Sequence, residues 1–81
     1  MDTVEGLVTL ARQRHRVRTL LASGQARRLR ERAGLTQQEV GQACGVTATA
    51  VARWESGDRL PHGETLARYG GLLERLVEVG E

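Results

Sequence analysis

The sequence contains no lysine and no phenylalanine, and only one proline, one cysteine, one tryptophan and one tyrosine. The single cysteine, Cys44, excludes an internal disulfide framework and leaves too few thiolates for a zinc finger. His15 and His62 are the only histidines, and no acidic residues stand at a ligand spacing, so we expect no metal site and no cofactor. The Gly70–Gly71 pair lacks the lysine and the preceding strand of a phosphate-binding loop. We therefore expect a protein that is not an enzyme.

Long hydrophobic runs are missing as well. No apolar stretch approaches the roughly 18 residues of a membrane span, and no signal-peptide pattern begins the chain, so we expect a cytoplasmic protein with no membrane partner. The 81 residues are enough for one small domain. A core of that size contributes only a few kcal/mol of net stability, which is compatible with an oligomer or an extended partner.

Positive charge is concentrated in the first part of the chain. Residues 1–32 hold eight arginines against three acids, whereas residues 33–81 hold four arginines against seven acids. The arginines fall into two clusters, Arg12, Arg14, Arg16 and Arg18 beside His15, and Arg27, Arg28, Arg30 and Arg32. Such a basic half is typical of a protein that binds a phosphate backbone. A solvated helix face is an equally good interpretation of the charge alone.

The hydrophobic periodicity is helical throughout, and no alternating run bounded by turns indicates a strand. We therefore expect an all-α fold of four to five helices. The first helix carries an apolar stripe formed by Val4, Leu7, Val8 and Ala11. Further helices are expected over 25–33, 37–44 and 48–55, and a last one carries Leu66, Tyr69, Leu73, Leu76 and Val77. Gly70–Gly71 predicts a bend or a division in it, because each glycine costs roughly 1 kcal/mol relative to alanine.

Capping residues mark three helix starts. Asp2 followed by Glu5 is a weak capping box. Thr36 followed by Glu39 is a stronger one, in which the hydroxyl accepts from the Glu39 amide and the carboxylate reaches back. Thr47 is the N-cap candidate of the helix over 48–55. Ala50, Val51 and Trp54 share the inner face of that helix, and Ala48, Thr49, Ala52 and Arg53 share its outer face.

Two short helices separated by a glycine-containing turn are the pattern of a helix-turn-helix motif. The segments that fill it are Leu29-Arg30, Gly34-Leu35-Thr36-Gln37-Gln38-Glu39-Val40, Gly45-Val46-Thr47, Trp54-Glu55-Ser56-Gly57 and Pro61. They resemble the phage-repressor, Cro and xenobiotic-response-element type of helix-turn-helix protein over about residues 25–74. The resemblance implies a lambda-repressor-like bundle with the DNA-binding domain over 25–74. An Arg-rich amphipathic N-terminal helix over 1–24 is expected before this domain, and a helix end or tail over 75–81 after it.

The resemblance also implies roles in DNA binding. The base-contacting candidates lie on the outer face of the second motif helix: Ala48, Thr49, Ala52 and Arg53. Arg53 can form hydrogen bonds to O6 and N7 of one guanine, whereas the two alanines offer only apolar contact. We therefore expect few direct contacts that distinguish one base from another. The backbone-contacting candidates are Gln37, Gln38, Thr47 and Arg59, and Arg12, Arg14, Arg16 and Arg18 form a candidate basic flank. Each role has an alternative. Arg53 would instead contact a phosphate or form a surface salt bridge, and Gln37 would be a plain surface residue. Thr47 would serve only as a helix cap, and Arg59 would be a solvated loop residue.

Five further residues have structural interpretations. Arg30 points toward the inner side of its helix, and a buried guanidinium must be paired. By resemblance its partner is Glu55, so the two are expected to form an ion pair that joins their helices. Gly41 stands where the family usually has alanine, which permits a close crossing of the two motif helices. Trp54 and Cys44 are expected in the core, where the thiol is inert.

Three functions remain open. The first is a sequence-specific DNA-binding transcriptional regulator, a repressor of phage or bacterial type at the nucleoid, that binds double-stranded DNA as a homodimer. Its dimer seam is expected either on residues 4–21 or on Leu72, Leu73, Leu76 and Val77. The second is an antitoxin-like protein-interaction module whose residues 1–22 bind a protein partner. The third is an architectural protein whose arginines clamp the DNA backbone without reading bases.

Overall fold

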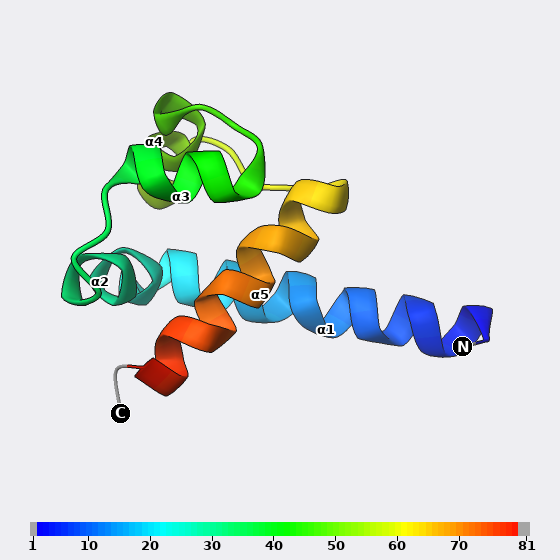
Figure 1. Cartoon of the computed structure of the whole chain (residues 1–81). Helices are drawn as coiled ribbons and strands as arrows, with labels where there is room; N and C mark the ends of the chain where they lie inside the picture. The colour runs from blue at the N-terminus through cyan, green and yellow to red at the C-terminus, as the bar shows by residue number, and fades with distance from the viewer. Residues whose placement is uncertain (1, 80–81) are drawn as a thin grey trace.

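A computed structural model describes residues 2–79, which form five α-helices and no strand (Figure 1). The helices are α1 (Thr3–Ala22), α2 (Gln25–Arg32), α3 (Gln37–Cys44), α4 (Ala48–Ser56) and α5 (Gly63–Val79). This confirms the all-helical fold class expected from the sequence. None of these helices is long and apolar enough to span a bilayer.

Short-range hydrogen bonds set the helix starts. The Asp2 carboxylate accepts from the Glu5 amide at 2.9 Å. Thr36 and Glu39 make both bonds of the capping box, at 3.0 and 2.9 Å. Beyond α3, Gly45 adopts a φ of 76°, a left-handed conformation that glycine reaches without steric cost. The chain therefore turns directly from α3 into α4, as the helix-turn-helix pattern predicts.

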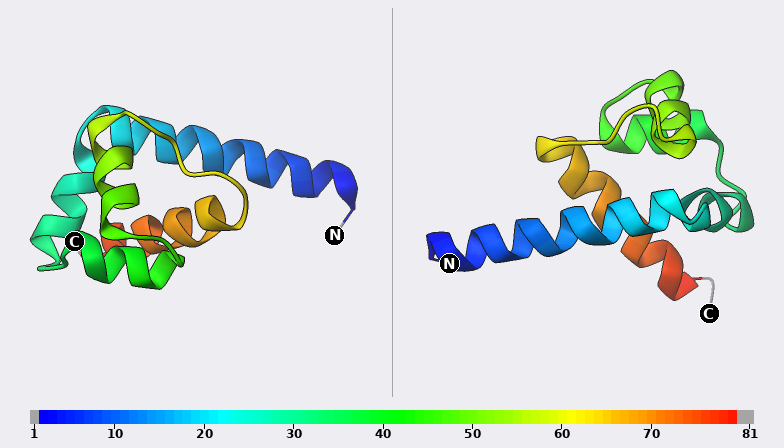
Figure 2. Two further views of the ribbon diagram at one scale, coloured as in Figure 1. Left: turned by 90° about the horizontal axis from the view of Figure 1, so that it is seen from above. Right: turned by 180° about the vertical axis from the view of Figure 1, so that it is seen from behind.

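The helices form a small bundle from which one helix extends. Helices α3 and α4 pack against each other, and α5 packs against α1, α2 and α3 (Figures 1 and 2). The N-terminal half of α1 projects beyond the other helices in all three views. A helix of 20 residues is about 30 Å long, which explains most of the longest dimension of the molecule, 37 Å.

The core lies where the inner faces of all five helices meet. Its buried members are Val17, Leu21, Ala26, Leu29, Val40, Cys44, Val51, Trp54, Leu66, Tyr69, Leu73 and Leu76. The Trp54 and Tyr69 rings lie with their centroids 4.7 Å apart and their planes inclined by 46°. Burial raises the pKa of the Cys44 thiol, which disfavours the reactive thiolate. Cys44 and Trp54 are thus core residues, as the sequence predicts.

The division of the last helix expected at Gly70–Gly71 does not occur, because α5 runs without interruption from Gly63 to Val79. Gly70 is buried against α1, and a Cβ there would lie 2.9 Å from the side chain of Gln13. The Gln13 amide also donates to the carbonyl of Ala67 on α5, at 3.4 Å. The absence of a side chain at Gly70 therefore permits α1 to approach α5 closely. Burial of the apolar face of α5 outweighs the helix-breaking tendency of the two glycines.

Gly41 also permits a close approach, but not the one expected. A Cβ at Gly41 would lie 2.7 Å from the carbonyl oxygen of Val46, in the turn before α4. The Gly41 carbonyl in turn accepts from the Val46 amide at 2.8 Å. Gly41 therefore makes room for the backbone of the turn rather than for a crossing of two helix bodies.

Candidate nucleic-acid interface

Helix α4 is buried on one side and open on the other. Val51 and Trp54 are buried in the core, whereas Thr49 and Arg53 are exposed on the opposite side. Ala48 and Ala52 lie between these two faces and are half-buried. Of the four base-contacting candidates, Thr49 and Arg53 are therefore fully accessible to another molecule, and the two alanines are partly accessible.

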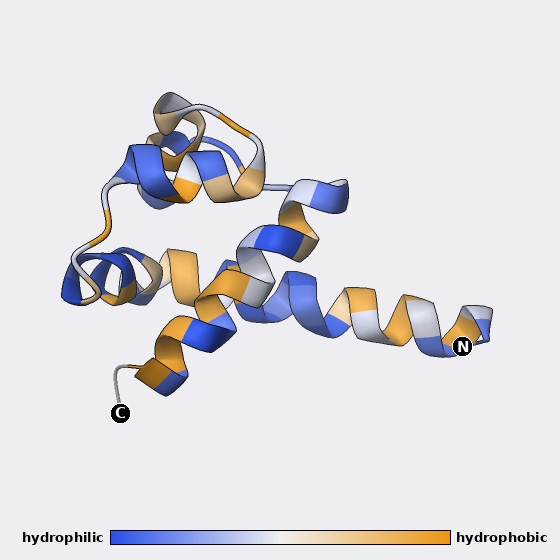
Figure 3. Ribbon diagram, viewed as in Figure 1, coloured by the Kyte–Doolittle hydropathy of each residue, from blue (hydrophilic) through white to orange (hydrophobic). Residues whose placement is uncertain are grey.

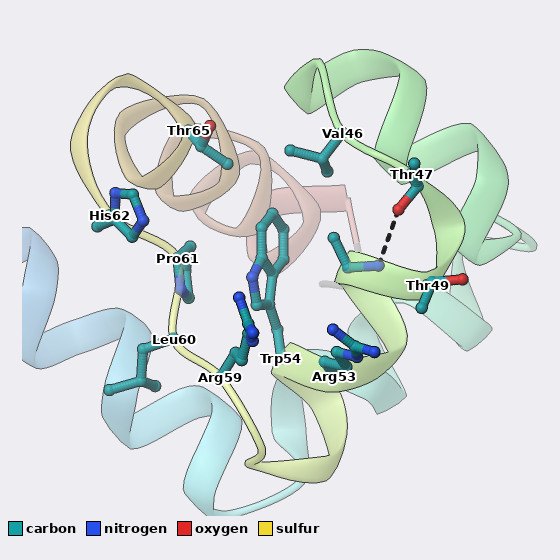
Figure 4. A pocket seen from close by; sticks show the side chains of 11 residues that line it. Val46, Thr47, Thr49, Arg53, Trp54, Arg59, Leu60, Pro61, His62 and Thr65 are labelled. Carbon is teal, nitrogen blue, oxygen red and sulfur yellow. Dashed lines mark hydrogen bonds between the residues drawn. The ribbon is translucent and has the colours of Figure 1, made fainter.

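A hollow of about 280 Å³ lies beside this face (Figure 4). Arg53 and Thr49 line it from α4, and Arg59, Leu60 and His62 line it from the loop before α5. Arg53 and Arg59 lie near Trp54, at one end of the hollow, and both side chains are exposed. The loop residues Leu60 and His62 were not singled out from the sequence, because only the fold brings that loop beside α4.

Two of the backbone-contacting candidates, Thr47 and Gln38, lie at helix starts, and Arg59 lies in the loop before α5. The Thr47 hydroxyl accepts from the Ala50 amide at 3.1 Å, so this side chain caps α4 (Figure 4). Gln38 is exposed in the first turn of α3. Arg59 is held by its backbone, since its amide donates to the Arg53 carbonyl at 3.3 Å. Among the described residues, the side chains of these three candidates form no hydrogen bond with one another.

An ion pair fixes the orientation of α4 relative to α2. The guanidinium of Arg30 donates from Nε to Glu55 at 2.6 Å and from Nη2 at 2.9 Å. Its third nitrogen donates to the Leu35 carbonyl at 2.9 Å. Both side chains are largely shielded from solvent, with 11% and 5% exposed. The structure thus contains the pair that the sequence predicts, and a planar guanidinium with two parallel bonds defines the geometry well.

Gln37 takes part in the same network, which the sequence did not reveal. Its side-chain amide donates to Glu55 at 3.1 Å, so it links α3 to α4. From the sequence alone, the Gln37 amide is expected either to contact a phosphate or to lie at the surface. A single amide nitrogen carries two protons, and the bond to Glu55 uses one of them. No local pattern predicts this contact, because the two residues meet only after α3 and α4 have packed.

The network shifts two pKa values. The hydrogen bond to Glu55 is the main reason why the pKa of Arg30 lies above its ordinary value, against the opposing effect of burial. Burial is the largest effect on Glu55 and opposes its ionisation. The hydrogen bonds from Arg30 and Gln37, together with the charge of Arg30, outweigh burial and lower the pKa of Glu55. The pair is therefore charged at neutral pH.

The fold divides the arginine cluster of α1 into two pairs. Residues two apart in a helix point about 200° apart, whereas residues four apart point in similar directions. Arg14 and Arg18 line a second hollow, of about 290 Å³, which shares Leu60, Pro61 and His62 with the hollow beside α4. Arg12 and Arg16 are exposed elsewhere on the helix and do not line it. The basic flank is therefore continuous with the α4 side only through Arg14 and Arg18.

Within residues 2–79, no group of three or more His, Cys, Asp or Glu side chains is placed to hold a metal ion.

Comparisons with curated proteins and with solved structures found no match to this chain. A comparison with protein-family models found one described as a helix-turn-helix domain, which matches residues 22–78. This match covers α2 to α5 almost completely and leaves most of α1 outside it. The chain therefore belongs to the helix-turn-helix domain family, whose fold is one that DNA-binding regulators use.

Proposed function

We propose that the protein is a sequence-specific transcriptional regulator, a repressor of the phage or bacterial Cro-like type, that binds its operator as a dimer at the nucleoid. The observation that carries this proposal is the two-sided character of α4. Val51 and Trp54 hold the helix against the core, while Thr49 and Arg53 are exposed on the other side. A helix of this kind can enter the major groove without losing its support.

Arg53 is the proposed main base reader. Its guanidinium can donate two hydrogen bonds to O6 and N7 of a guanine, which is worth about 1–3 kcal/mol of discrimination. Thr49 offers a hydroxyl and a methyl group to a base edge. Ala48 and Ala52 contribute only apolar contact, for instance with a thymine methyl group. Because one strong reader gives limited specificity, two copies on an inverted repeat are needed for a selective operator.

Backbone contacts are proposed around this helix. The free amides at the starts of α3 and α4, near Gln37, Gln38 and Thr47, can bind phosphate oxygens. Arg59 projects from the loop beside α4, and Arg14 and Arg18 extend the positive surface along α1. Arg12 and Arg16 lie away from this surface, so we assign them no phosphate contact.

The proposal is tested by selection from a random duplex library at ~150 mM salt, where non-specific phosphate binding is partly screened. We expect an inverted repeat whose half-site centres lie about 10 base pairs apart. A bound pool that stays random would contradict sequence-specific regulation. Strong retention of a random pool, with a steep salt dependence, would instead identify an architectural protein.

An Arg53→Ala variant tests whether Arg53 contacts a base. Loss of two bonds to guanine is expected to weaken operator binding by about 5- to 150-fold and to relax the preference at one position per half-site. Arg75→Ala is the matched control, because it removes the same charge from the C-terminal part of α5, far from α4 in Figure 1. Equal effects of the two substitutions would show that Arg53 acts only through its charge.

The antitoxin-like protein-interaction module stays as a second candidate, because Val4 and Leu7 on α1 are 68% and 61% exposed. In that function α1 binds a different protein, and DNA binding is secondary. Arg53→Ala separates the two candidates, since it weakens operator binding and relaxes its sequence preference in a regulator, and leaves capture of a protein partner unchanged in an interaction module.

A further inference from the structure

The N-terminal half of α1 carries several apolar residues (Figure 3), and it exposes an apolar face that the bundle does not cover. Val4, Leu7 and Val8 are 68%, 61% and 39% exposed, and Ala11 continues the same stripe. The buried residues of α1 are Val17 and Leu21, in its second half. The other seam considered from the sequence, on α5, is largely used inside the molecule, because Leu73 and Leu76 are buried in the core. The stripe on α1 is therefore the stronger candidate for a contact with another molecule.

This half of α1 also lacks internal support as a helix. Its first seven residues include Thr3, Val4, Gly6, Val8 and Thr9, which are β-branched residues or glycine and are poor helix formers. In addition it projects beyond the other helices (Figures 1 and 2). Short helices in water depend on the packing of an apolar face. A partner that covers the stripe would supply that packing.

The stripe is self-complementary when two copies run antiparallel. The spacings along Val4, Leu7, Val8 and Ala11 are three, one and three residues, so the pattern reads the same in both directions. A two-fold axis between Leu7 and Val8 therefore brings Val4 opposite Ala11 and Leu7 opposite Val8. An interface of this kind is isologous and closes after two subunits.

Charge also favours this arrangement. Glu5 and Arg12 are seven residues apart, so they lie on the same edge of the stripe. Their midpoint falls one residue from that of the stripe, about 1.5 Å along the helix axis. Both are exposed, and among residues 2–79 neither forms an ion pair. Antiparallel pairing places Glu5 of each copy near Arg12 of the other. In a parallel two-fold pair the same edge of the two helices lies on opposite sides of the seam, so these residues of the two copies would not meet.

We infer that the N-terminal half of α1 is the self-association surface of this protein, and that its partner is a second copy bound antiparallel through Val4, Leu7, Val8 and Ala11 with reciprocal Glu5–Arg12 ion pairs. This inference rests on the proposed function at one point only: it names the surface through which the proposed dimer of the regulator forms. It places the two bundles at opposite ends of the paired helices. The two Val17 residues would then lie about 28 Å apart along the shared axis, close to the ~34 Å between half-sites on one face of DNA.

Sedimentation of the full chain without DNA tests the inference, over about 10 µM to 1 mM protein because the seam is short and the affinity correspondingly modest. We expect reversible dimerisation that Leu7→Glu weakens at least tenfold. Val79→Glu is the matched control, since Val79 is 74% exposed and lies outside the stripe. Helical content and thermal unfolding of dilute Leu7→Glu protein verify its fold. A monomer throughout the range, or equal association of Leu7→Glu and wild type, overturns the inference.

Charge exchange tests the antiparallel geometry. Glu5→Arg and Arg12→Glu are each expected to weaken self-association, because each places like charges in both reciprocal pairs. An equimolar mixture of the two variants restores both pairs and is expected to form heterodimers with at least the wild-type affinity. No recovery in the mixture overturns the antiparallel seam.

The two proposals fail separately. Dimers with these properties that select no DNA sequence would refute the regulator and leave the seam intact. An enriched operator bound by a protein whose Leu7→Glu variant dimerises normally would refute the seam and leave the regulator intact.

Discussion

At the scale of single residues, Arg30 connects three parts of the helix-turn-helix unit. It bonds Glu55 on α4 with two nitrogens and the Leu35 carbonyl before α3 with the third. Gln37 adds a bond to the same carboxylate from α3. The side chains that donate hydrogen bonds to the shielded Glu55 carboxylate therefore belong to other helices, and the orientation of α4 depends on these bonds.

Loss of Arg30 is expected to be costly. In Arg30→Ala, Glu55 stays in a shielded site without its counter-ion, so we expect the free energy of unfolding to fall by about 3 kcal/mol. Urea unfolding measures the change. Arg27→Ala is the control, because its ion pair with Glu31 is exposed and is expected to contribute less than about 0.5 kcal/mol. Similar losses in the two variants would contradict a special role for Arg30.

The pKa of Glu55 predicts a dependence of stability on acid. The pKa is lower in the folded protein than in the unfolded chain, so the contribution of Glu55 is complete above its unfolded pKa of about 4.3. It is lost as the pH falls below that value and through the folded pKa. We expect the free energy of unfolding, measured from pH 6 to pH 2.5, to fall less steeply for Glu55→Gln than for wild type. Parallel curves would show that other carboxylates cause the acid sensitivity.

At the scale of helices, two glycines that both lie inside a helix have different roles. A Cβ at Gly41 in α3 would meet the backbone of the following turn, whereas a Cβ at Gly71 in α5 would meet no atom within 4 Å. The first glycine allows α3 and the start of α4 to come close together. The second only lowers the helix propensity of α5.

Alanine substitutions at these glycines are therefore expected to have opposite signs. Gly71→Ala should raise the free energy of unfolding by about 1 kcal/mol, through the higher helix propensity of alanine. Gly41→Ala should lower it by about 1 kcal/mol or more, because a backbone carbonyl at 2.7 Å must move. Thermal unfolding of both variants checks the signs. A stabilised Gly41→Ala protein would mean that the turn adjusts without cost.

At the scale of the whole molecule, the fold directs positive charge to one side of α1. Arg14 and Arg18 line the hollow that adjoins the α4 side, and Arg53 and Arg59 continue the positive surface there. The excess of arginine in residues 1–32 is thus only partly available to DNA bound along α4.

This division predicts the salt dependence of operator binding. Each phosphate contact contributes about −0.9 to the slope of log affinity against log salt. We expect Arg18→Ala to make the slope shallower by about that amount and to weaken all duplexes similarly. Arg75→Ala should leave it unchanged. Affinities measured between 50 and 200 mM salt give the slopes, and an unaltered slope for Arg18→Ala would remove Arg18 from the interface.

The sequence by itself determined the features that depend on short-range interactions. The caps at Asp2, Thr36 and Thr47 involve residues three positions apart, and the glycine-containing turn between the motif helices is equally local. The hydrophobic period placed Val51 and Trp54 inside and Thr49 and Arg53 outside. The Arg30–Glu55 pair spans 25 residues, and its prediction needed both the inward position of Arg30 and the family resemblance.

Only the tertiary structure decided the features that depend on which helices meet. Gln37 donates a hydrogen bond to Glu55, and the side chain of Gln13 packs against Gly70. Both contacts join residues that are far apart in the chain. The apolar stripe of α1 and the apolar face of α5 look alike as sequence patterns. They differ because α5 lies across the bundle, where Leu73 and Leu76 are buried, whereas the first turns of α1 extend beyond any helix that could cover them.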